Sequence, residues 1–199
     1  MKLVTYSIRD TERVGLIGTD PGKVVPVQTL GFQAGDMCAF IDELSGTAPS
    51  TLLSQVDAAP GDALAECRLL APIRSPRQDV VCLGVNYYEH RDETLASNIK
   101  YDGKLSNPVY FSKRVHTAVD PGGSIDSHSD FVECLDYEVE LAVILARDAY
   151  QVPKEQVESY VLGYTILNDV SARDLQSAHQ QWYFGKSLDG FTPIGPWIV

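Results

Sequence analysis

The chain has 199 residues, of which 44% are hydrophobic, 22% charged and 9% aromatic. This composition is typical of a globular protein with a sizeable core, and it excludes low-complexity disorder, collagen-like repeats and coiled coils. Acidic residues outnumber basic ones by 27 to 16, which gives a formal net charge of −11. Such a balance argues against nucleic acid or an anionic membrane surface as the main partner.

The N-terminus and the cysteines predict a reduced, cytoplasmic protein without a membrane span. Arg9 interrupts the first apolar stretch, which is too short for a signal peptide. The apolar run 141–146 is far below the roughly 20 residues that cross a bilayer. The four cysteines lie far apart and form no C-x-x-C pair, which indicates buried thiols rather than a disulfide framework.

Residues 1–70 predict a small N-terminal α/β domain. Short strand-like runs are separated by turn residues, and two segments with helical spacing of apolar residues follow them. The expected strands lie at 2–8, 14–17 and 24–27, and the expected helices around 40–44 and 52–56. No residue type here suggests chemistry, so we expect a scaffold or packing domain.

Residues 71–199 predict a β-rich catalytic domain, which makes the chain as a whole an α+β protein. The expected strands lie at 69–73, 80–85, 109–112, 137–145 and 160–167, and the expected helices at 87–97, 153–159 and 171–181. The chain ends inside another strand-like run at 195–199, so we expect this domain to be cut short at its C-terminus.

The strand-like segment 135–145 carries the strongest chemical signal. Side chains alternate between the faces of a strand, so the odd-numbered apolar residues are expected to enter a core. The opposite face presents Asp136, Glu138 and Glu140 in a row. These carboxylates repel each other, and a hard divalent cation such as Mg²⁺ or Mn²⁺ would relieve the repulsion. The alternative is an acidic face that water solvates.

A further carboxylate, Asp169, ends the next strand-like run. If the two strands are neighbours, Asp169 converges on Glu138 and Glu140, and Asp136 lies outside that set.

The polar loop 113–130 offers a competing metal site. Its candidate ligands are Asp126, His128 and Asp130 in the segment 124–130, with His116 and Asp120 upstream. Loops of this composition are usually turns, which is the simpler interpretation.

Two other segments carry candidate catalytic groups. His90 and Glu93 fall at i and i+3 on one face of an expected helix, where the carboxylate would orient the imidazole as a general base. Lys186 follows Gly185, which lets the backbone approach closely, and its ammonium could lie beside a developing oxyanion. The alternatives are a surface His–Glu pair and a solvated lysine.

Four ordered motifs carry a family resemblance. They are V-N-Y-x-x-H-x-x-E from residue 85, D-Y-E-V-E-L-A from 136, N-D-V-S-A-R-D-x-Q from 168 and G-K-S-x-D-G-F from 185. Together they resemble the fumarylacetoacetate hydrolase family from about residue 70 onward. The resemblance implies a mixed β-roll catalytic domain that binds Mg²⁺ or Mn²⁺, often in a homodimer, with Ca²⁺ as a substitute.

The resemblance also implies roles for individual residues. Glu138, Glu140 and Asp169 would hold the metal. The remaining assignments are His90 and Glu93 as the water-activating dyad, Lys186 as a further catalytic group, and Tyr87, Lys113 and Gln176 as substrate contacts. Family members continue past the G-P-W strand, so this chain would lack strands that help to enclose the substrate.

The main functional prediction is a metal-dependent hydrolase that cleaves a C–C bond of an acylpyruvate-like or fumarylpyruvate-like 1,3-dicarbonyl acid through an enolate. His90, oriented by Glu93, would take a proton from water, and Lys186 would help to stabilise the enolate. The same chemistry supports an alternative: a decarboxylase, isomerase or hydratase of a 2-oxo dicarboxylic acid such as oxaloacetate, in aromatic catabolism.

Two alternatives come from other classes. A truncated, non-catalytic structural subunit would fold normally and show no turnover with metal present. A magnesium-dependent nuclease would use the same carboxylates and Lys186, but the net charge of −11 and the lack of a basic stripe disfavour it.

Overall fold

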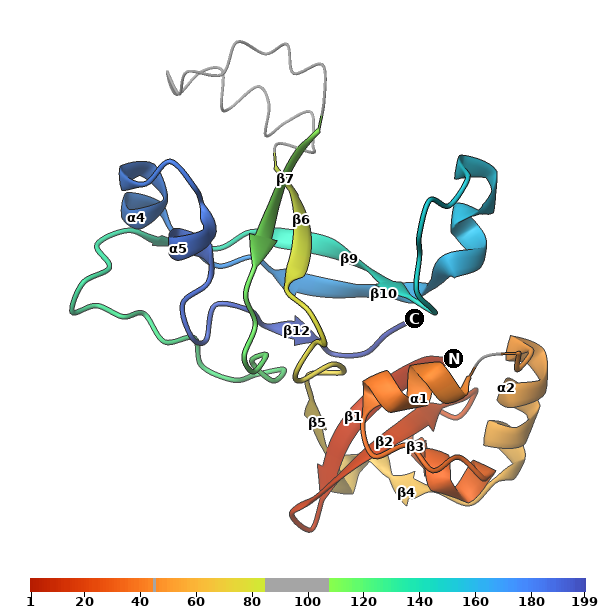
Figure 1. The fold of residues 1–199 in the computed structure, drawn as a ribbon. Helices are drawn as coiled ribbons and strands as arrows, with labels where there is room; N and C mark the ends of the chain where they lie inside the picture. Colours follow the sequence, from red (N-terminus) through yellow and green to blue (C-terminus); the bar gives the residue numbers. More distant parts are fainter. Residues whose placement is uncertain (45, 85–107) are drawn as a thin grey trace.

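The computed structural model describes residues 1–44, 46–84 and 108–199, which form an α+β structure (Figure 1). The N-terminal part is a five-stranded antiparallel sheet in the order β4-β3-β2-β1-β5. Its strands are β1 (Lys2–Ile8), β2 (Thr11–Ile17), β3 (Lys23–Pro26), β4 (Asp62–Ala63) and β5 (Arg68–Leu70). The three strands expected before residue 28 are confirmed.

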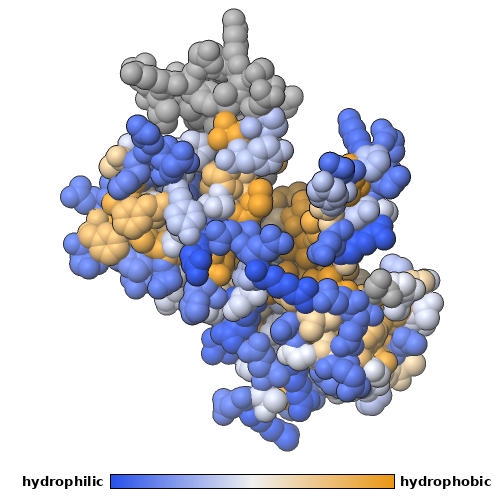
Figure 2. Space-filling view, viewed as in Figure 1, coloured by the Kyte–Doolittle hydropathy of each residue, from blue (hydrophilic) through white to orange (hydrophobic). Residues whose placement is uncertain are grey.

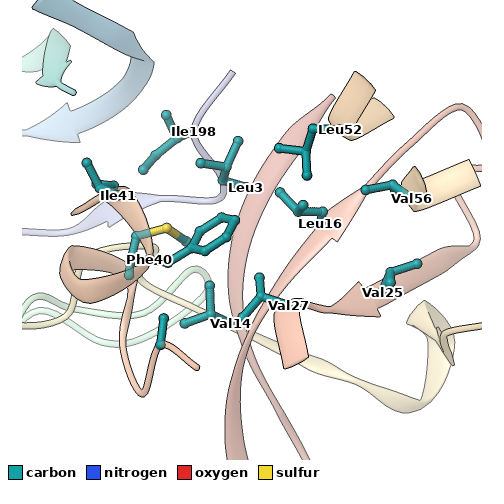
Figure 3. Packing of buried hydrophobic residues seen from close by; sticks show 12 residues of the cluster. Leu3, Val14, Leu16, Val25, Val27, Phe40, Ile41, Leu52, Val56 and Ile198 are labelled. Carbon is teal, nitrogen blue, oxygen red and sulfur yellow. The ribbon is translucent and has the colours of Figure 1, made fainter. Parts of the chain in front are cut away.

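Two helices, α1 (Met37–Glu43) and α2 (Pro49–Ala58), cover this sheet (Figure 1). Asp36 caps α1 by accepting a hydrogen bond from the Ala39 backbone N–H at 2.8 Å. The apolar face of the helices packs on the sheet in one buried cluster that includes Phe40, Val56 and Leu16 (Figure 3). Short 3₁₀ turns, η1 (Val27–Leu30) and η2 (Leu64–Glu66), complete this part.

The segment around Ile198 joins this N-terminal core. Leu3 and Ile198 exchange backbone hydrogen bonds at 2.9 and 3.0 Å. The Ile198 side chain is fully buried and lies beside Leu3 in the cluster (Figure 3). Residues at opposite ends of the sequence therefore share one core, which ties the N-terminal sheet to the second group of strands.

The second part contains three small antiparallel sheets, ordered β12-β10-β9, β11-β8 and β6-β7. The strands are β6 (Val80–Gly84), β7 (Val109–Lys113), β8 (Leu135–Asp136), β9 (Val139–Leu145), β10 (Val161–Asn168), β11 (Ser171–Ala172) and β12 (Ile194–Gly195). The helical segments are η3 (Lys154–Tyr160), α4 (Arg173–Ala178) and α5 (Tyr183–Lys186). None of the described helices is long and apolar enough to cross a membrane.

The helix expected at 171–181 begins two residues later than the sequence suggests. Ser171 and Ala172 form strand β11, in which Ser171 is in register with Asp136 of β8. The Ser171 hydroxyl donates to the Asp169 backbone oxygen at 2.9 Å instead of capping the helix. Strand pairing with a distant segment thus overrides the local cap signal. Likewise, the helix expected at 153–159 is the 3₁₀ turn η3.

The prediction that the odd-numbered residues of the acidic strand enter a core is wrong. Tyr137, Val139 and Leu141 are 72%, 67% and 63% exposed. The opposite face turns inward for two reasons. Ala142 and Ile144 pack against buried clusters, and Glu138 before them forms ion pairs with Arg173 and Lys186. Pairing therefore decides which of the two alternating faces is buried.

A groove of about 720 Å³ lies between α1, β6 and the β9–β10 hairpin. Its lining is largely apolar and includes Ile41, Val80, Ala142 and Leu167. Figure 2 shows this hydrophobic surface in a hollow flanked by hydrophilic residues. The second part thus presents apolar surface on both faces of the β9–β10 hairpin.

Replacing Ile198 tests the link between the two ends of the chain. Ile198→Ala removes a fully buried side chain and should lower the free energy of unfolding by about 2–5 kcal/mol, measured by urea denaturation. Val199→Ala is the matched control, because Val199 is 58% exposed and pairs with Tyr164 through its backbone. Equal stability of the two variants would contradict this packing.

Candidate active site

Strand pairing brings the acidic residues of β8 and β9 beside Asp169. Asn168, at the end of β10, is in register with Val139 of β9. The Asp169 backbone N–H donates to the Glu138 backbone oxygen at 2.8 Å, and the Asn168 side chain accepts from the Glu138 N–H at 3.1 Å. The two acidic segments are therefore neighbours, and Asp169 lies next to Glu138.

Lys186 joins these two carboxylates. Its ammonium lies 2.9 Å from Glu138 Oε2 and 2.8 Å from Asp169 Oδ2. Lys186 is only 2% exposed, so the interpretation as a solvated surface lysine is wrong. Because two carboxylates compensate the charge, burial of this ammonium is compatible with a stable fold.

Gly185 allows Lys186 to reach this position. A Cβ atom at Gly185 would lie 2.6 Å from the Gln176 backbone nitrogen and 2.8 Å from the Ala172 oxygen. The expected close backbone approach is therefore present, and it packs α5 directly on the start of α4.

Lys113 is a second buried cation at the end of β7. Its ammonium lies 2.8 Å from Asp169 Oδ1 and donates to the backbone oxygens of Val170 and Lys186. Burial lowers the pKa of Lys113, and the Asp169 charge only partly opposes that effect. The side chain expected to face substrate is thus directed at Asp169.

Arg173 is the functional residue that the sequence prediction missed. Its Nε and Nη2 donate to Asp136 Oδ2 at 3.0 and 2.8 Å. Its Nη1 lies 2.7 Å from Glu138 Oε1 and donates to Gln176 Oε1 at 3.0 Å. Burial raises the pKa of Asp136, but the hydrogen bonds from Arg173 and the Tyr137 backbone N–H, together with the charges of Arg173 and Lys186, outweigh it, and the net pKa lies below its ordinary value. The sequence contained a signal for this residue: carboxylates that face inward require cations, and Arg173 belongs to the N-D-V-S-A-R-D-x-Q motif.

These six side chains form a charge-balanced group, which we call the ionic cluster. Its members are the carboxylates Asp136, Glu138 and Asp169 and the cations Lys113, Arg173 and Lys186. Three negative charges face three positive ones, so the cluster is neutral when all six are ionised. Glu140 lies in β9, two residues after Glu138, and its charge acts on the nearby Cys82 thiol.

The donor chemistry of this region fits a hard divalent cation. Glu138, Glu140 and Asp169 supply only oxygen atoms, which Mg²⁺ and Mn²⁺ prefer. The ion pair with Lys113 lacks hydrogen-bond geometry, so Asp169 Oδ1 is a buried acceptor without a hydrogen bond among the described residues. Across residues 1–44, 46–84 and 108–199, no three His, Cys, Asp or Glu side chains are already grouped as a metal site. The carboxylates are organised around Lys186 and Arg173 instead.

The competing loop has structural partners instead. Asp120 accepts hydrogen bonds from Arg68 at 3.0 Å and from the Ala71 backbone N–H at 3.0 Å. His128 is bonded through Nε2 to the Asp189 backbone oxygen at 2.8 Å. These bonds fasten the loop to the fold, as expected of turn residues. The other sequence candidates, Tyr87, His90 and Glu93, lie outside the described residues.

A sequence profile described as "Fumarylacetoacetate (FAA) hydrolase C-terminal" matches residues 79–199, more than half of the chain. This chain belongs to the fumarylacetoacetate hydrolase family. Members of this family typically use divalent metals, and over residues 79–199 the chain carries the family's oxygen-rich acidic strand.

Relatives within the family are named after different reactions. Oxaloacetate tautomerase YisK of Bacillus subtilis is 39% identical over 137 residues, which are 69% of this chain and 44% of that protein. The fumarylacetoacetate hydrolase of Exiguobacterium antarcticum is 32% identical with a TM-score of 0.75. The 5-carboxymethyl-2-hydroxymuconate delta-isomerase of Mycobacterium smegmatis is 29% identical with a TM-score of 0.65. Both structures are matched by the whole of this chain, which covers 66% of each.

Substituting Gly185 tests the packing that positions Lys186. Gly185→Ala places a methyl group against the α4 backbone and should lower the free energy of unfolding by about 1–3 kcal/mol, measured by chemical denaturation. Gly35→Ala is the control, because nothing lies within 4 Å of its added Cβ. A neutral or stabilising Gly185→Ala would contradict the close approach.

The cysteines test the electrostatics beside the ionic cluster. Burial raises the pKa of Cys82 to about 12, and the Asp169 charge adds to the effect. At pH 8 only about one Cys82 thiol in ten thousand would be ionised, whereas Cys134 is exposed. We expect iodoacetamide to label Cys134 well before Cys82, as followed by peptide mass spectrometry. Equal labelling rates would contradict the burial of Cys82.

Proposed function

We propose that this chain is the metal-binding part of an enzyme that interconverts the tautomers of a 2-oxo dicarboxylic acid of the oxaloacetate type. The observation that carries the proposal is the convergence of Glu138 and Asp169 on the buried Lys186 ammonium. A relative named as an oxaloacetate tautomerase and a similar structure named as an isomerase favour this reaction over C–C hydrolysis. Hydrolysis is the second candidate, because another similar structure is named a hydrolase.

Three residues would hold the metal in this proposal. Glu140 lies in β9, and Glu138 and Asp169 directly flank the paired ends of β9 and β10; all three offer oxygen donors, with Mg²⁺ or Mn²⁺ as the natural ion and Ca²⁺ as a substitute. When bound, the divalent cation would supply Lewis-acid polarisation of the 2-oxo group.

Proton transfer would fall to this chain's own side chains. Tautomerisation moves a proton between C3 and the 2-oxo oxygen of the acid. We assign removal of the C3 proton to the imidazole of His90, which Glu93 would orient in one tautomer. The Lys186 ammonium would stabilise the negative charge that develops on the 2-oxo oxygen.

Gln176 and its neighbours would orient the acid. The Gln176 side-chain oxygen accepts a hydrogen bond from Arg173 Nη1, so its amide N–H groups are the atoms with which Gln176 could donate to a substrate. These N–H groups suit a substrate carboxylate, and Tyr87, which lies outside the described residues, would be a further substrate contact. Lys113 would not contact the acid but would hold Asp169 in place through their ion pair.

The proposal also covers the organisation of the protein. It would be a cytoplasmic homodimer, with a scaffold domain at residues 1–70 and a catalytic domain at residues 71–199.

Enzyme assays with matched variants test this proposal. Enol-to-keto conversion of oxaloacetate, followed by ultraviolet absorbance, should exceed the uncatalysed rate with Mg²⁺ or Mn²⁺ and return to it with excess chelator. His90→Ala should lower the rate by about 10²–10⁴-fold while metal still binds. Glu138→Gln should abolish metal binding, and Glu155→Gln, exposed on η3, should leave both unchanged.

The same assay separates the alternatives. Cleavage of an acylpyruvate without oxaloacetate tautomerisation would favour the hydrolase. Tautomerisation that survives the chelator would contradict the metal assignment. Folded protein that binds metal but converts neither acid would support the structural-subunit alternative.

A further inference from the structure

We propose that Arg173 competes with the divalent cation for Glu138, and that its release by the cation creates a binding group for the anionic substrate. The inference rests on the proposed function, because it concerns the same carboxylates. It assigns to Arg173 a substrate-binding role that is coupled to metal binding.

In the guanidinium of Arg173, Nε and Nη2 are held by one carboxylate, whereas Nη1 contacts different partners. Nε and Nη2 both donate to Asp136 Oδ2, at 3.0 and 2.8 Å, and hold the plane in place. Nη1 points away from this anchor, toward Glu138 Oε1 at 2.7 Å and Gln176 Oε1 at 3.0 Å. The ion pair between Nη1 and Glu138 can therefore break, and Nη1 can donate to another anion, without any movement of the rest of the side chain.

Among the cations of the ionic cluster, Arg173 is the one suited to this exchange. Lys113 is 0% exposed, and backbone oxygens also hold its ammonium. Lys186 is 2% exposed and sits between two carboxylates. The Arg173 side chain is 30% exposed and lies against Gln176, so an incoming acid can reach it.

Charge balance supplies the coupling. The ionic cluster is neutral, so a dication bound at Glu138 adds two positive charges to a largely desolvated region. An anionic acid that binds beside the dication offsets this added charge. The dication also draws Glu138 away from Arg173, which leaves Nη1 in need of an acceptor. Each ligand should therefore bind more tightly when the other is present.

Calorimetric titration of purified protein tests the competition, with Mn²⁺ as the first probe and oxalate as the second. Arg173→Gln removes the competing cation, so we expect it to bind Mn²⁺ about tenfold more tightly than the wild type. The same variant, once loaded with Mn²⁺, should bind oxalate at least tenfold more weakly. Opposite changes for the two ligands are not expected from a residue with a merely structural role.

Two further variants guard against misfolding and general charge effects. The double variant Asp136→Asn/Arg173→Gln removes the anchor and the guanidinium together, keeps the charge balance and should show the same opposite changes. Arg77→Gln is the matched control, because Arg77 pairs with Asp42 at 2.5 Å far from the ionic cluster and should change neither affinity.

The outcomes distinguish this inference from the proposed function. Wild type that binds Mn²⁺ while both Arg173 variants bind it equally or more weakly would overturn the competition and leave the metal site standing. Unchanged oxalate affinity in the loaded variants would overturn the release of Arg173 toward the anion. Failure of the wild type to bind Mn²⁺ would overturn both proposals.

Discussion

The chemistry of this protein depends on one constraint, which is that carboxylates turned inward by the sheet must be paired with cations from other elements. Asp169 is 2% exposed and lies between the ammonium groups of Lys113 and Lys186. Removing one partner of a buried pair leaves an uncompensated charge, which is far more destabilising than the pair itself is stabilising. The ionic cluster therefore fixes how β7, α4 and α5 sit around the acidic strand.

The backbone is shaped to make this pairing available. Strand β11 takes two residues that would otherwise start α4, and so places Arg173 at the first turn of the helix, beside Asp136. Gly185 lets α5 lie directly against α4, which carries Lys186 into the interior. The N-terminal sheet contributes no charge to the ionic cluster, but it holds the strand group through the Leu3–Ile198 pair.

The family of the chain and the share of its relatives that it covers determine what can be concluded about its function. It belongs to the fumarylacetoacetate hydrolase family and covers 66% of each of the two similar solved structures compared above. Among the described residues, apolar side chains of β9 and β10 such as Val139, Leu141 and Ile166 are largely exposed. Because the chain covers only part of these structures, the activity of the whole protein is a proposal.

The sequence by itself determined most of the strands among the described residues and which residues are candidates for the chemistry. Short apolar runs of strand length indicated β1, β6, β7, β9 and β10, and the acidic triplet with Asp169 indicated the candidate site. Four ordered motifs identified the family that the profile match then established.

Only the tertiary structure decided which face of β9 turns inward, because a period of two defines two faces without choosing between them. It also decided that Lys186 is buried and that Arg173 holds both Asp136 and Glu138. These ion pairs join residues 17 positions apart for Lys186 with Asp169, and 37 positions apart for Arg173 with Asp136. A local sequence pattern cannot predict ion pairs between residues so far apart in the sequence, because the packing of the whole chain determines which charges meet.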